Sequence, residues 1–339
     1  MRRVRGLIAA TAAAFVISAP AGAQPRGAEW RIPPNSEIAA LLAARIAPRR
    51  GQGIVIGMLD PSGRRVIADG PAGGPPFDGD TVFEIGSISK VFTALILADM
   101  ARKGEVALDA PAERYLPGGA HMPARGGRQI SLRDLALHIS GLPRLATNMP
   151  QGDRADPYAD YTDALMLDFL AHYRLPRDIS ARFEYSNLGG ALLGYLLARA
   201  VGGDYDTLLR ERVTGPLGMN DTSVALSASQ QARFAPGFDP LMHSAKPWRF
   251  VQPGAGGIHS TANDMLKFAA AALDPNSPIG PAMKLALAVR VPSDDPSADQ
   301  ALGWRVARVE PGREIPLHDG GTGGFRSLLA LDPAKGSAV

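Results

Sequence analysis

The sequence predicts an α+β protein in which strands from both ends of the chain form one antiparallel sheet around a helical middle. Apolar runs with strand character and tight turns open and close the chain, and apolar residues recur at helical spacing between them. No internal repeat interrupts this order. We therefore expect an α/β sandwich lobe from about 36–85 and 255–339, and an all-helical lobe from about 86–254.

A helix and a hairpin begin the predicted domain. Residues 35–50 carry apolar side chains on one helical face, behind a cap at Asn35 or Ser36. The runs 53–60 and 64–70 flank a turn rich in proline, serine and glycine. This pattern predicts two antiparallel strands.

The helices of the middle differ in the apolar surface that they carry. From Ser87 to Lys103 apolar residues cover nearly the whole circumference, which predicts a buried helix that Gly104 ends. Farther along, Asp264 is placed to complete a capping box at a helix that begins near Thr261. The remaining helices are expected at 131–138, 160–172, 188–201 and 204–213, and the closing strands at 302–309, 314–319 and 325–332.

Residues 1–23 have the composition of a secretory signal peptide. Arginines precede an apolar run, and Ala21-Gly22-Ala23 offers small residues for cleavage before Gln24. A membrane anchor is the alternative, but the run is shorter than the roughly 20 residues that a span needs. We expect a periplasmic or secreted protein with no integral membrane segment after cleavage.

Charge and cysteine content argue against several classes of protein. Loss of Arg2, Arg3 and Arg5 with the signal peptide leaves 33 basic and 33 acidic residues, so nucleic acid is not an expected partner. The chain has no cysteine, so it can form no disulfide bond and has no thiol nucleophile. The histidines lack metal-ligand spacing. We expect neither a metal nor a cofactor.

The last residues, 337–339, begin a strand that the sequence does not continue. The preceding residues, 331–336, have the composition of a turn. We expect a fragment whose natural C-terminus is missing. A short final edge strand is the alternative.

Ser87 and Lys90 form the only Ser-x-x-Lys in a chain with six lysines. The spacing places both side chains on one face of a helix. Burial in an apolar helix lowers the pKa of a lysine, so that its neutral amine can take the serine proton. The helix N-terminus favours negative charge that develops beside Ser87. The pattern predicts an activated serine nucleophile; a capping serine followed by a surface lysine is the alternative.

Tyr185-Ser186-Asn187 stands just before a predicted helix. In an extended segment Tyr185 and Asn187 point the same way. A phenol beside an ammonium can shuttle a proton, and an amide can hold a substrate carbonyl. The alternative is a turn in which Asn187 caps the helix and Tyr185 packs in the core.

The stretch from His318 to Phe325 begins at the end of a predicted strand and contains the glycine-rich loop 320–324. Glycines let a substrate lie against strand backbone, and a backbone N–H there can complete an oxyanion hole. His318 can donate a hydrogen bond to a carboxylate or carbonyl. A hairpin loop with a surface histidine is the alternative.

These stretches together resemble the penicillin-binding serine hydrolases, which include class C β-lactamases, D,D-carboxypeptidases and β-lactamase-like esterases. The three motifs at Ser87, Tyr185 and His318 occur in the order of that family. The stretches FEIGSISKVFTA, ISLRDLALHISGLP, GPLGMNDTS and GGIHSTANDM are also similar, and the likeness runs from about residue 36 to the end. It implies the transpeptidase-like fold of these enzymes.

The resemblance also implies roles for the motif residues. Ser87 would be the nucleophile, and Lys90 and Tyr185 would share the acid–base work. The N–H groups of Ser87 and Gly321 would form the oxyanion hole. The residues implied to bind substrate are Asn187, His318, Gly320 and Gly321.

The third motif departs from the family pattern, since His318-Asp319-Gly320 stands where Lys-Thr-Gly is usual. A lysine is a permanent cation for a substrate carboxylate, whereas a histidine is mostly neutral at pH 7. Arg326 supplies the missing charge if it points into the cleft. Residues 140–157 form a long polar loop that is placed to border that cleft.

The expected function is a periplasmic serine hydrolase that forms an acyl-enzyme on Ser87. Its substrate would be a β-lactam or a peptidoglycan-derived amide of the D-Ala-D-Ala type. Small carboxylic esters are the alternative substrates, because they need no carboxylate anchor. The alternative of another class is a sensor or scaffold that keeps the fold without hydrolysis. His138 and His259 are expected in core or loop roles.

Overall fold

The computed structural model describes residues 32–46, 52–70 and 76–339. The predicted signal peptide, 1–23, and its cleavage site therefore lie outside the described residues. Residues 34–339 form one compact unit. No helix within the described ranges combines the length and the apolar character needed to cross a bilayer.

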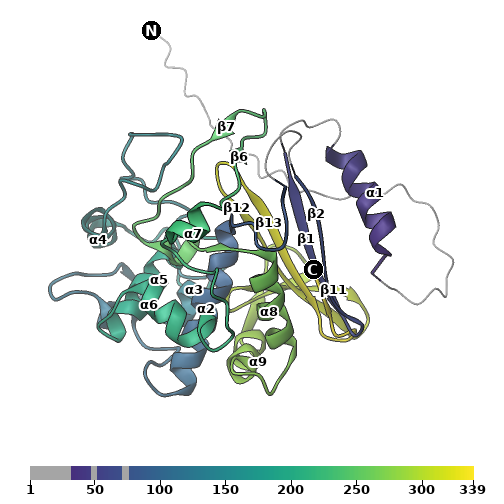
Figure 1. The fold of residues 1–339 in the computed structure, drawn as a ribbon. Coiled ribbons are helices and arrows are strands. Elements are labelled where there is room, and N and C mark those ends of the chain that lie inside the picture. The colour runs from purple at the N-terminus through teal and green to yellow at the C-terminus, as the bar shows by residue number, and fades with distance from the viewer. Residues whose placement is uncertain (1–31, 47–51, 71–75) are drawn as a thin grey trace, which may run out of the picture. The chain divides into compact units, whose positions relative to one another are not determined.

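An antiparallel sheet of eight strands dominates the described chain, in the order β2-β1-β14-β13-β12-β11-β10-β9 (Figure 1). Strands from both ends of the sequence meet in it, which confirms the predicted α+β class and the shared sheet. The strands are β1 (Ile54–Asp60), β2 (Gly63–Asp69), β9 (Arg290–Pro292), β10 (Ala298–Ala301), β11 (Trp304–Glu310), β12 (Arg313–Gly321), β13 (Arg326–Asp332) and β14 (Ser337–Ala338).

The short strand β14 joins the two halves of this sheet. Ala338 pairs with Leu59 of β1 on one side and with Leu331 of β13 on the other. Residues 337–338 therefore lie inside the sheet, so the alternative of a final edge strand is wrong. The predicted hairpin is present as β1–β2, and its register runs from Ile54 opposite Asp69 to Asp60 opposite Gly63.

Helices gather on one side of the sheet, while α1 lies beside β2 (Figure 1). The buried helix α2 runs through their midst, and nearly all of its side chains are buried, as its apolar circumference predicts. The helices are α1 (Asn35–Ile46), α2 (Ser89–Arg102), α3 (Leu132–Ala136), α4 (Asp163–His172), α5 (Asn187–Ala200), α6 (Tyr205–Leu209), α7 (Ala228–Gln231), α8 (Ala262–Leu273) and α9 (Gly280–Ala288).

Some boundaries differ from the expectation. The helix predicted from Ser87 begins as a 3₁₀ turn, η1 (Gly86–Ile88), and continues as α2. Helix α3 is shorter than predicted, because His138 takes a left-handed backbone conformation with φ 58° that ends helical geometry. The helix α9 and the strands β9 and β10 were not among the predicted elements.

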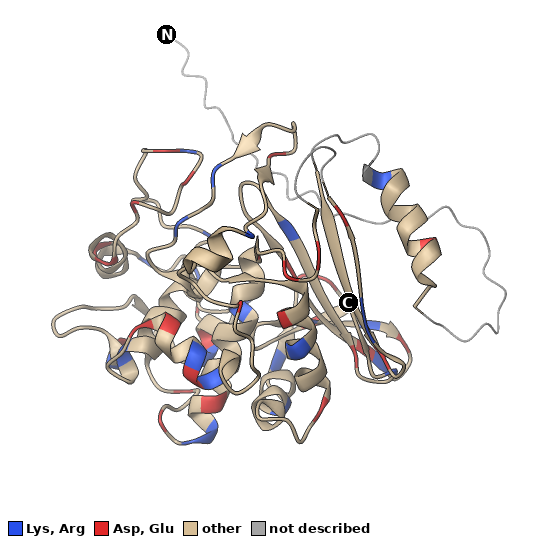
Figure 2. Ribbon diagram, viewed as in Figure 1, with Lys and Arg blue, Asp and Glu red and all other residues tan. Residues whose placement is uncertain are grey.

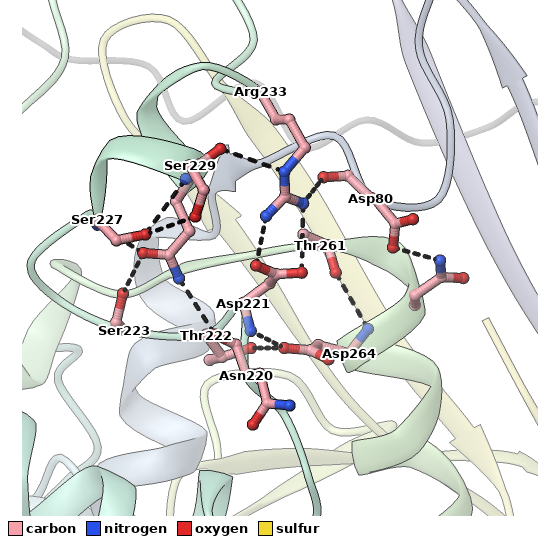
Figure 3. A network of polar contacts seen from close by, with 12 residues as sticks. Asp80, Asn220, Asp221, Thr222, Ser223, Ser227, Ser229, Arg233, Thr261 and Asp264 are labelled. Carbon is pink, nitrogen blue, oxygen red and sulfur yellow. Dashed lines mark hydrogen bonds and ion pairs between the residues drawn. The ribbon is translucent and has the colours of Figure 1, made fainter.

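The predicted capping box at α8 is wrong in one half. The Thr261 hydroxyl accepts from the Asp264 N–H, as a cap should. The Asp264 carboxylate instead accepts from the Asp221 N–H at 2.8 Å and the Thr222 hydroxyl at 2.9 Å (Figure 3). It therefore holds a loop against α8, and Arg233 extends this network by an ion pair with Asp221.

Basic and acidic residues are interspersed over the described elements (Figure 2). Many form local pairs, such as Lys103 with Asp99 and Arg212 with Glu105. This distribution agrees with the nearly equal numbers of basic and acidic residues in the sequence.

Candidate active site

Ser87 lies in the turn η1, between the short strand β3 (Phe83–Glu84) and helix α2. Gly86 precedes it with φ 51°, a conformation that favours glycine. A Cβ on Gly86 would stand 2.6 Å from the backbone nitrogen of Gly321, so a side chain there would collide with β12. The turn is thus held directly against the strand that carries the third motif.

Lys90 reaches Ser87 from the first turn of α2. Its Nζ lies 3.0 Å from Ser87 Oγ and donates a second hydrogen bond, 2.6 Å long, to the Ala255 carbonyl. The side chain is only 3% exposed. Burial, and next the Arg144 charge, lowers the pKa of Lys90 to about 7, although Asp319 opposes the shift. A neutral lysine amine is therefore available near neutral pH.

The carbonyl that holds Lys90 belongs to a short 3₁₀ turn, η4 (Pro253–Ala255), which α2 fixes in place. The Thr93 hydroxyl donates to the Gly254 carbonyl at 2.7 Å, and Ser89 Oγ accepts from the Ile258 N–H at 3.1 Å. Thr93 and Ser89 of α2 thus hold in place the segment whose Ala255 carbonyl binds Lys90. Within helix α5, Gly190 leaves room for Lys90, since a Cβ there would lie 3.0 Å from Lys90 Cε.

Tyr185 closes the other side of Ser87. Ser87 is among the polar groups that act on the pKa of the Tyr185 hydroxyl, and Lys90 Nζ lies 5.0 Å from the centre of the Tyr185 ring. Burial raises the pKa of Tyr185 above its ordinary value. The group is therefore a neutral phenol, able to donate and accept hydrogen bonds beside the serine and the lysine.

His138 packs against the ring of Tyr185. The two ring planes are tilted by 38° with centres 4.5 Å apart, and His138 Nδ1 accepts a hydrogen bond from the Ser186 N–H at 3.2 Å. Burial lowers the pKa of His138 well below its ordinary value, so the ring is neutral. His259, half-buried, contacts the Val224 carbonyl through Nδ1. The positions of both histidines are consistent with the predicted core or loop roles.

Asn187 is the first residue of α5, and Ser186 rather than Asn187 caps that helix by accepting from the Gly189 N–H at 2.8 Å. The alternative in which Asn187 is the cap is therefore wrong. Asn187 Nδ2 donates to the Tyr158 hydroxyl at 3.2 Å. Its Oδ1 is buried and has no hydrogen-bond partner among the described residues, so one acceptor remains for a ligand N–H.

His318 is buried on β12 and directs Nδ1 to the Asp319 carbonyl, 2.6 Å away. Burial, with the charge of Lys90 as the next cause, lowers the pKa of His318 to about 4. The ring is therefore neutral at the pH of ordinary solution, and the surface histidine considered as an alternative is wrong. His318 offers a polar edge but no charge.

One guanidinium nitrogen of Arg326 is hydrogen-bonded to the glycine-rich loop. Its Nη1 donates to the carbonyls of Thr322 and Phe325, both at 2.6 Å. The guanidinium is thus bound to the backbone of the glycine-rich loop. A Cβ on Gly321 would lie 3.4 Å from Arg326 Nη1, so the charged group lies near the end of β12, and its action on a substrate stays a prediction.

The end of β12 presents a backbone donor beside Ser87. The Thr322 N–H donates to the Phe325 carbonyl across the hairpin, so these residues form a hydrogen-bonded pair. Because hydrogen-bonded and non-hydrogen-bonded pairs alternate, the next pair, Gly321–Arg326, is non-hydrogen-bonded and the Gly321 N–H points away from β13. Gly86 of the turn η1 lies close to this nitrogen.

Gly320 also allows β12 to lie close to the segment that precedes Ser87. A Cβ on Gly320 would stand 2.0 Å from the Ile85 carbonyl oxygen, which already accepts a hydrogen bond from Ser327 at 2.8 Å. The structure therefore brings all seven predicted site residues to one place. These residues are Ser87, Lys90, Tyr185, Asn187, His318, Gly320 and Gly321.

Two residues of this place were not predicted. The Arg144 guanidinium lies 5.1 Å from the centre of the Tyr185 ring, and no ion pair of it is found among the residues that the structure describes. Tyr158 bonds Asn187 and stacks on Phe250 with ring centres 4.6 Å apart. Arg144 belongs to the loop 140–157 that the sequence marks only as polar, and neither residue carries a motif that could have identified it.

That loop also borders a cavity of about 330 Å³ beside Tyr158. The loop is fixed to a second segment, because Lys246 pairs with Asp153 at 2.8 Å and Trp248 Nε1 donates to the Ala155 carbonyl at 2.9 Å. The cavity is lined by Leu145, Met149, Pro150, Gln151, Gly152, Asp153, Arg154, Pro157, Tyr158 and Trp248. None of the predicted site residues lines this cavity, and the loop approaches the site through Arg144 instead.

Metal-binding chemistry has no candidate cluster in the described ranges of the chain, where no three histidine, cysteine or acidic side chains are grouped to hold an ion. The polar groups beside Ser87 are an amine, a phenol, an amide and backbone N–H donors. Such a set suits attack by a serine on a carbonyl carbon.

Comparison with known proteins agrees with this chemistry. The family described as Beta-lactamase matches residues 39–339. The D-alanyl-D-alanine-carboxypeptidase/endopeptidase AmpH of Escherichia coli K12 is 31% identical over 273 residues, which cover 76% of this chain and 69% of that protein. A beta-lactamase of Pseudomonas fluorescens is 27% identical over 302 residues, 78% of this chain and 79% of its own.

A solved structure gives the same result. The beta-lactamase/D-alanine carboxypeptidase of Yersinia pestis, complexed with citrate, superimposes with a TM-score of 0.77 at 27% identity. The match covers 90% of this chain and 92% of that one.

Proposed function

Because the chain belongs to the beta-lactamase family of serine hydrolases, we propose that it cleaves an amide or ester carbonyl through an acyl-enzyme on Ser87. One observation carries the proposal. The Ser87 hydroxyl lies 3.0 Å from the buried amine of Lys90, whose lowered pKa makes it a base near pH 7. The Tyr185 phenol on the other side completes a short path for protons.

Acylation follows from this arrangement. The neutral Lys90 amine takes the Ser87 proton as Oγ bonds to the carbonyl carbon, and the carbonyl electron pair moves onto oxygen. When the tetrahedral intermediate collapses, its bond to the leaving nitrogen or oxygen breaks. The leaving group receives a proton from Lys90, either directly or through Tyr185. The acyl group remains on Ser87.

Deacylation repeats these transfers with water. The water gives a proton to the Lys90–Tyr185 pair while its oxygen bonds to the acyl carbon, and the bond to Ser87 Oγ then breaks. The proton returns to Ser87, and a carboxylic acid leaves. Because burial keeps Tyr185 neutral, we assign the base to Lys90 and the relay to Tyr185.

The negative charge on the former carbonyl oxygen requires donors. The backbone N–H of Ser87 and that of Gly321, which lies close to η1, are the proposed pair. Each such donor contributes about 3 to 4 kcal/mol to the stabilisation of a transition state. Asn187, with its unpartnered Oδ1, is proposed to accept an N–H of a substrate amide.

The substrate class that we propose first is a D-Ala-D-Ala type amide or a β-lactam. The likeness to D-alanine carboxypeptidases and the free amide oxygen of Asn187 support it. Small esters are the second candidate, which the neutral His318 in place of a lysine favours. The signal peptide predicted at 1–23 supports a periplasmic or secreted location.

Turnover of three substrates tests the proposal. Purified protein is assayed with a chromogenic cephalosporin, an N-acylated D-Ala-D-Ala peptide and 4-nitrophenyl acetate, beside Ser87→Ala and the surface control Ser229→Ala. We expect hydrolysis of at least one substrate by wild type and Ser229→Ala, and its loss in Ser87→Ala. Hydrolysis that survives in Ser87→Ala would refute the mechanism. No hydrolysis by wild type would leave the fold as a binding module.

A further inference from the structure

The loop 140–157 places one arginine at the mouth of the site, over the ring of Tyr185. The Arg144 guanidinium lies 5.1 Å from the ring centre, and in the described part of the chain it makes no ion pair. Its side chain is exposed, so a ligand in the site can reach it. The ring is also the one that Lys90 approaches from within.

The backbone of Arg144 is not free to move. Its carbonyl accepts hydrogen bonds from the Asn187 N–H at 3.0 Å and from the Leu188 N–H at 3.2 Å. These are groups at the start of α5 that lack partners within the helix. Arg144 is therefore fixed to the same helix end that positions Asn187, and its guanidinium extends from a rigid base.

The other basic side chains around Ser87 are hydrogen-bonded to the protein or carry no charge. Lys90 is bonded to Ser87 and Ala255, and Arg326 is bonded to the loop carbonyls of Thr322 and Phe325. His318 carries no charge near neutral pH because it is buried. Among these groups, Arg144 is the cation whose side chain has no hydrogen bond or ion pair within the described residues, and it contacts the Tyr185 ring.

We propose that Arg144 binds a carboxylate of the substrate and so takes over the part of the lysine that the His318-Asp319-Gly320 motif lacks. This inference rests on the proposed function. A guanidinium can bind a carboxylate through two parallel hydrogen bonds, and it stays charged at every working pH. The substrate class is accordingly an acyl compound that carries a carboxylate near the scissile bond.

Asp319 limits where that carboxylate can lie. Its exposed side chain acts on Lys90 and Tyr185 from the β12 side, whereas Arg144 acts on them from the loop 140–157. A carboxylate is attracted toward Arg144 and repelled from Asp319. The substrate anion is therefore expected on the loop side of the Tyr185 ring.

Matched ester pairs test the proposal. Phenyl phenylacetate is compared with 3-carboxyphenyl phenylacetate, which places the anion on the leaving group, and phenyl butyrate with monophenyl glutarate, which places it on the acyl group. The variants are Arg144→Met and Arg144→Lys. Arg199→Met is the control, because Arg199 also covers a tyrosine ring, Tyr195, at 5.7 Å, at the far end of α5.

We expect wild type to prefer one anionic ester over its neutral partner by about tenfold or more in kcat/KM, since a hydrogen bond to a charged group contributes that much discrimination. Arg144→Met should abolish the preference, Arg144→Lys should keep part of it, and Arg199→Met should keep all of it. Added salt should weaken the wild-type preference and leave the Arg144→Met ratio unchanged. A purely structural Arg144 would lower both rates together.

The proposal is overturned if Arg144→Met keeps the wild-type ratio, or if wild type prefers neither anionic ester. Calorimetric titration with phenylacetate and phenylacetamide supplies a readout that needs no turnover. Tighter binding of the anion that is lost only in Arg144→Met supports the proposal, and equal binding of the two compounds contradicts it. Binding that depends on Arg144 in a protein that hydrolyses nothing would refute the proposed function alone.

Discussion

Lowering the pH from 8 to 6 should slow acylation by about tenfold, because it protonates Lys90. With a pKa of about 7, roughly nine-tenths of the lysine is neutral at pH 8 and roughly one-tenth at pH 6. Only the neutral amine can take the Ser87 proton. The second-order rate constant kcat/KM, which reports the free enzyme, should therefore rise tenfold across these two pH units.

Other groups around Lys90 titrate outside this interval. Burial holds the pKa of His318 at about 4 and that of His138 well below its ordinary value, while Tyr185 is raised above its own. Glu84, three residues before Ser87, is the exception, since burial raises its pKa to about 7. The variant Glu84→Gln separates its titration from that of Lys90.

The assay follows 4-nitrophenyl acetate or the best substrate of the panel from pH 5.5 to 8.5, in wild type and Glu84→Gln. We expect both proteins to show one inflection near pH 7. A rate that is constant over this range would refute the assignment of Lys90 as the base. An inflection that disappears in Glu84→Gln would transfer the titration to the carboxyl group.

Three further predictions concern the supports of the site. Thr93→Val should cost about 1 to 3 kcal/mol in urea unfolding, because it leaves the buried Tyr205 hydroxyl without the bond of 2.6 Å, and adding Tyr205→Phe should restore part of the loss. Gly190→Ala should lower kcat/KM about 10- to 100-fold, because the added methyl group displaces Lys90. A kcat/KM equal to that of wild type would contradict this prediction. Between pH 5 and 8 the free energy of unfolding of wild type should fall by about 2 to 3 kcal/mol more than that of Glu84→Gln. The reason is that the raised pKa of Glu84 in the folded state gives stability that is lost as the pH rises through 7. Parallel plots of unfolding free energy against pH for the two proteins would contradict this.

The parts of the site that could be predicted are those set by local spacing. Ser87 and Lys90 are one helical turn apart, so their meeting follows from the helix itself. The apolar circumference of α2 likewise predicted that Lys90 is buried. The shared sheet followed from strands at both chain ends.

The remaining features depend on segments that are distant in the chain. The Ala255 carbonyl is 165 residues away from the lysine that it holds. The position of Arg144 depends on hydrogen bonds to the start of α5, and the neutral state of His318 depends on burial under neighbouring elements. No periodicity reports such contacts, which is why Arg144 and the role of η4 emerged only from the structure.

Two details that were missed depend on contacts with distant segments. The left-handed backbone of His138 shortened α3, and the Asp264 carboxylate turned toward Asp221 and Thr222 instead of its own helix end (Figure 3). In both places a tertiary contact outcompeted a local preference. The two-lobe division remains a prediction.

The most direct test of the central claim is the intact mass of the protein after mixing with benzylpenicillin, sampled from seconds to an hour. The account predicts an increase equal to the mass of the drug on wild type and none on Ser87→Ala. A lasting adduct means slow deacylation, as in a D,D-peptidase, and a transient one with accumulating penicilloate means a β-lactamase. An adduct that forms equally on Ser87→Ala would contradict the account.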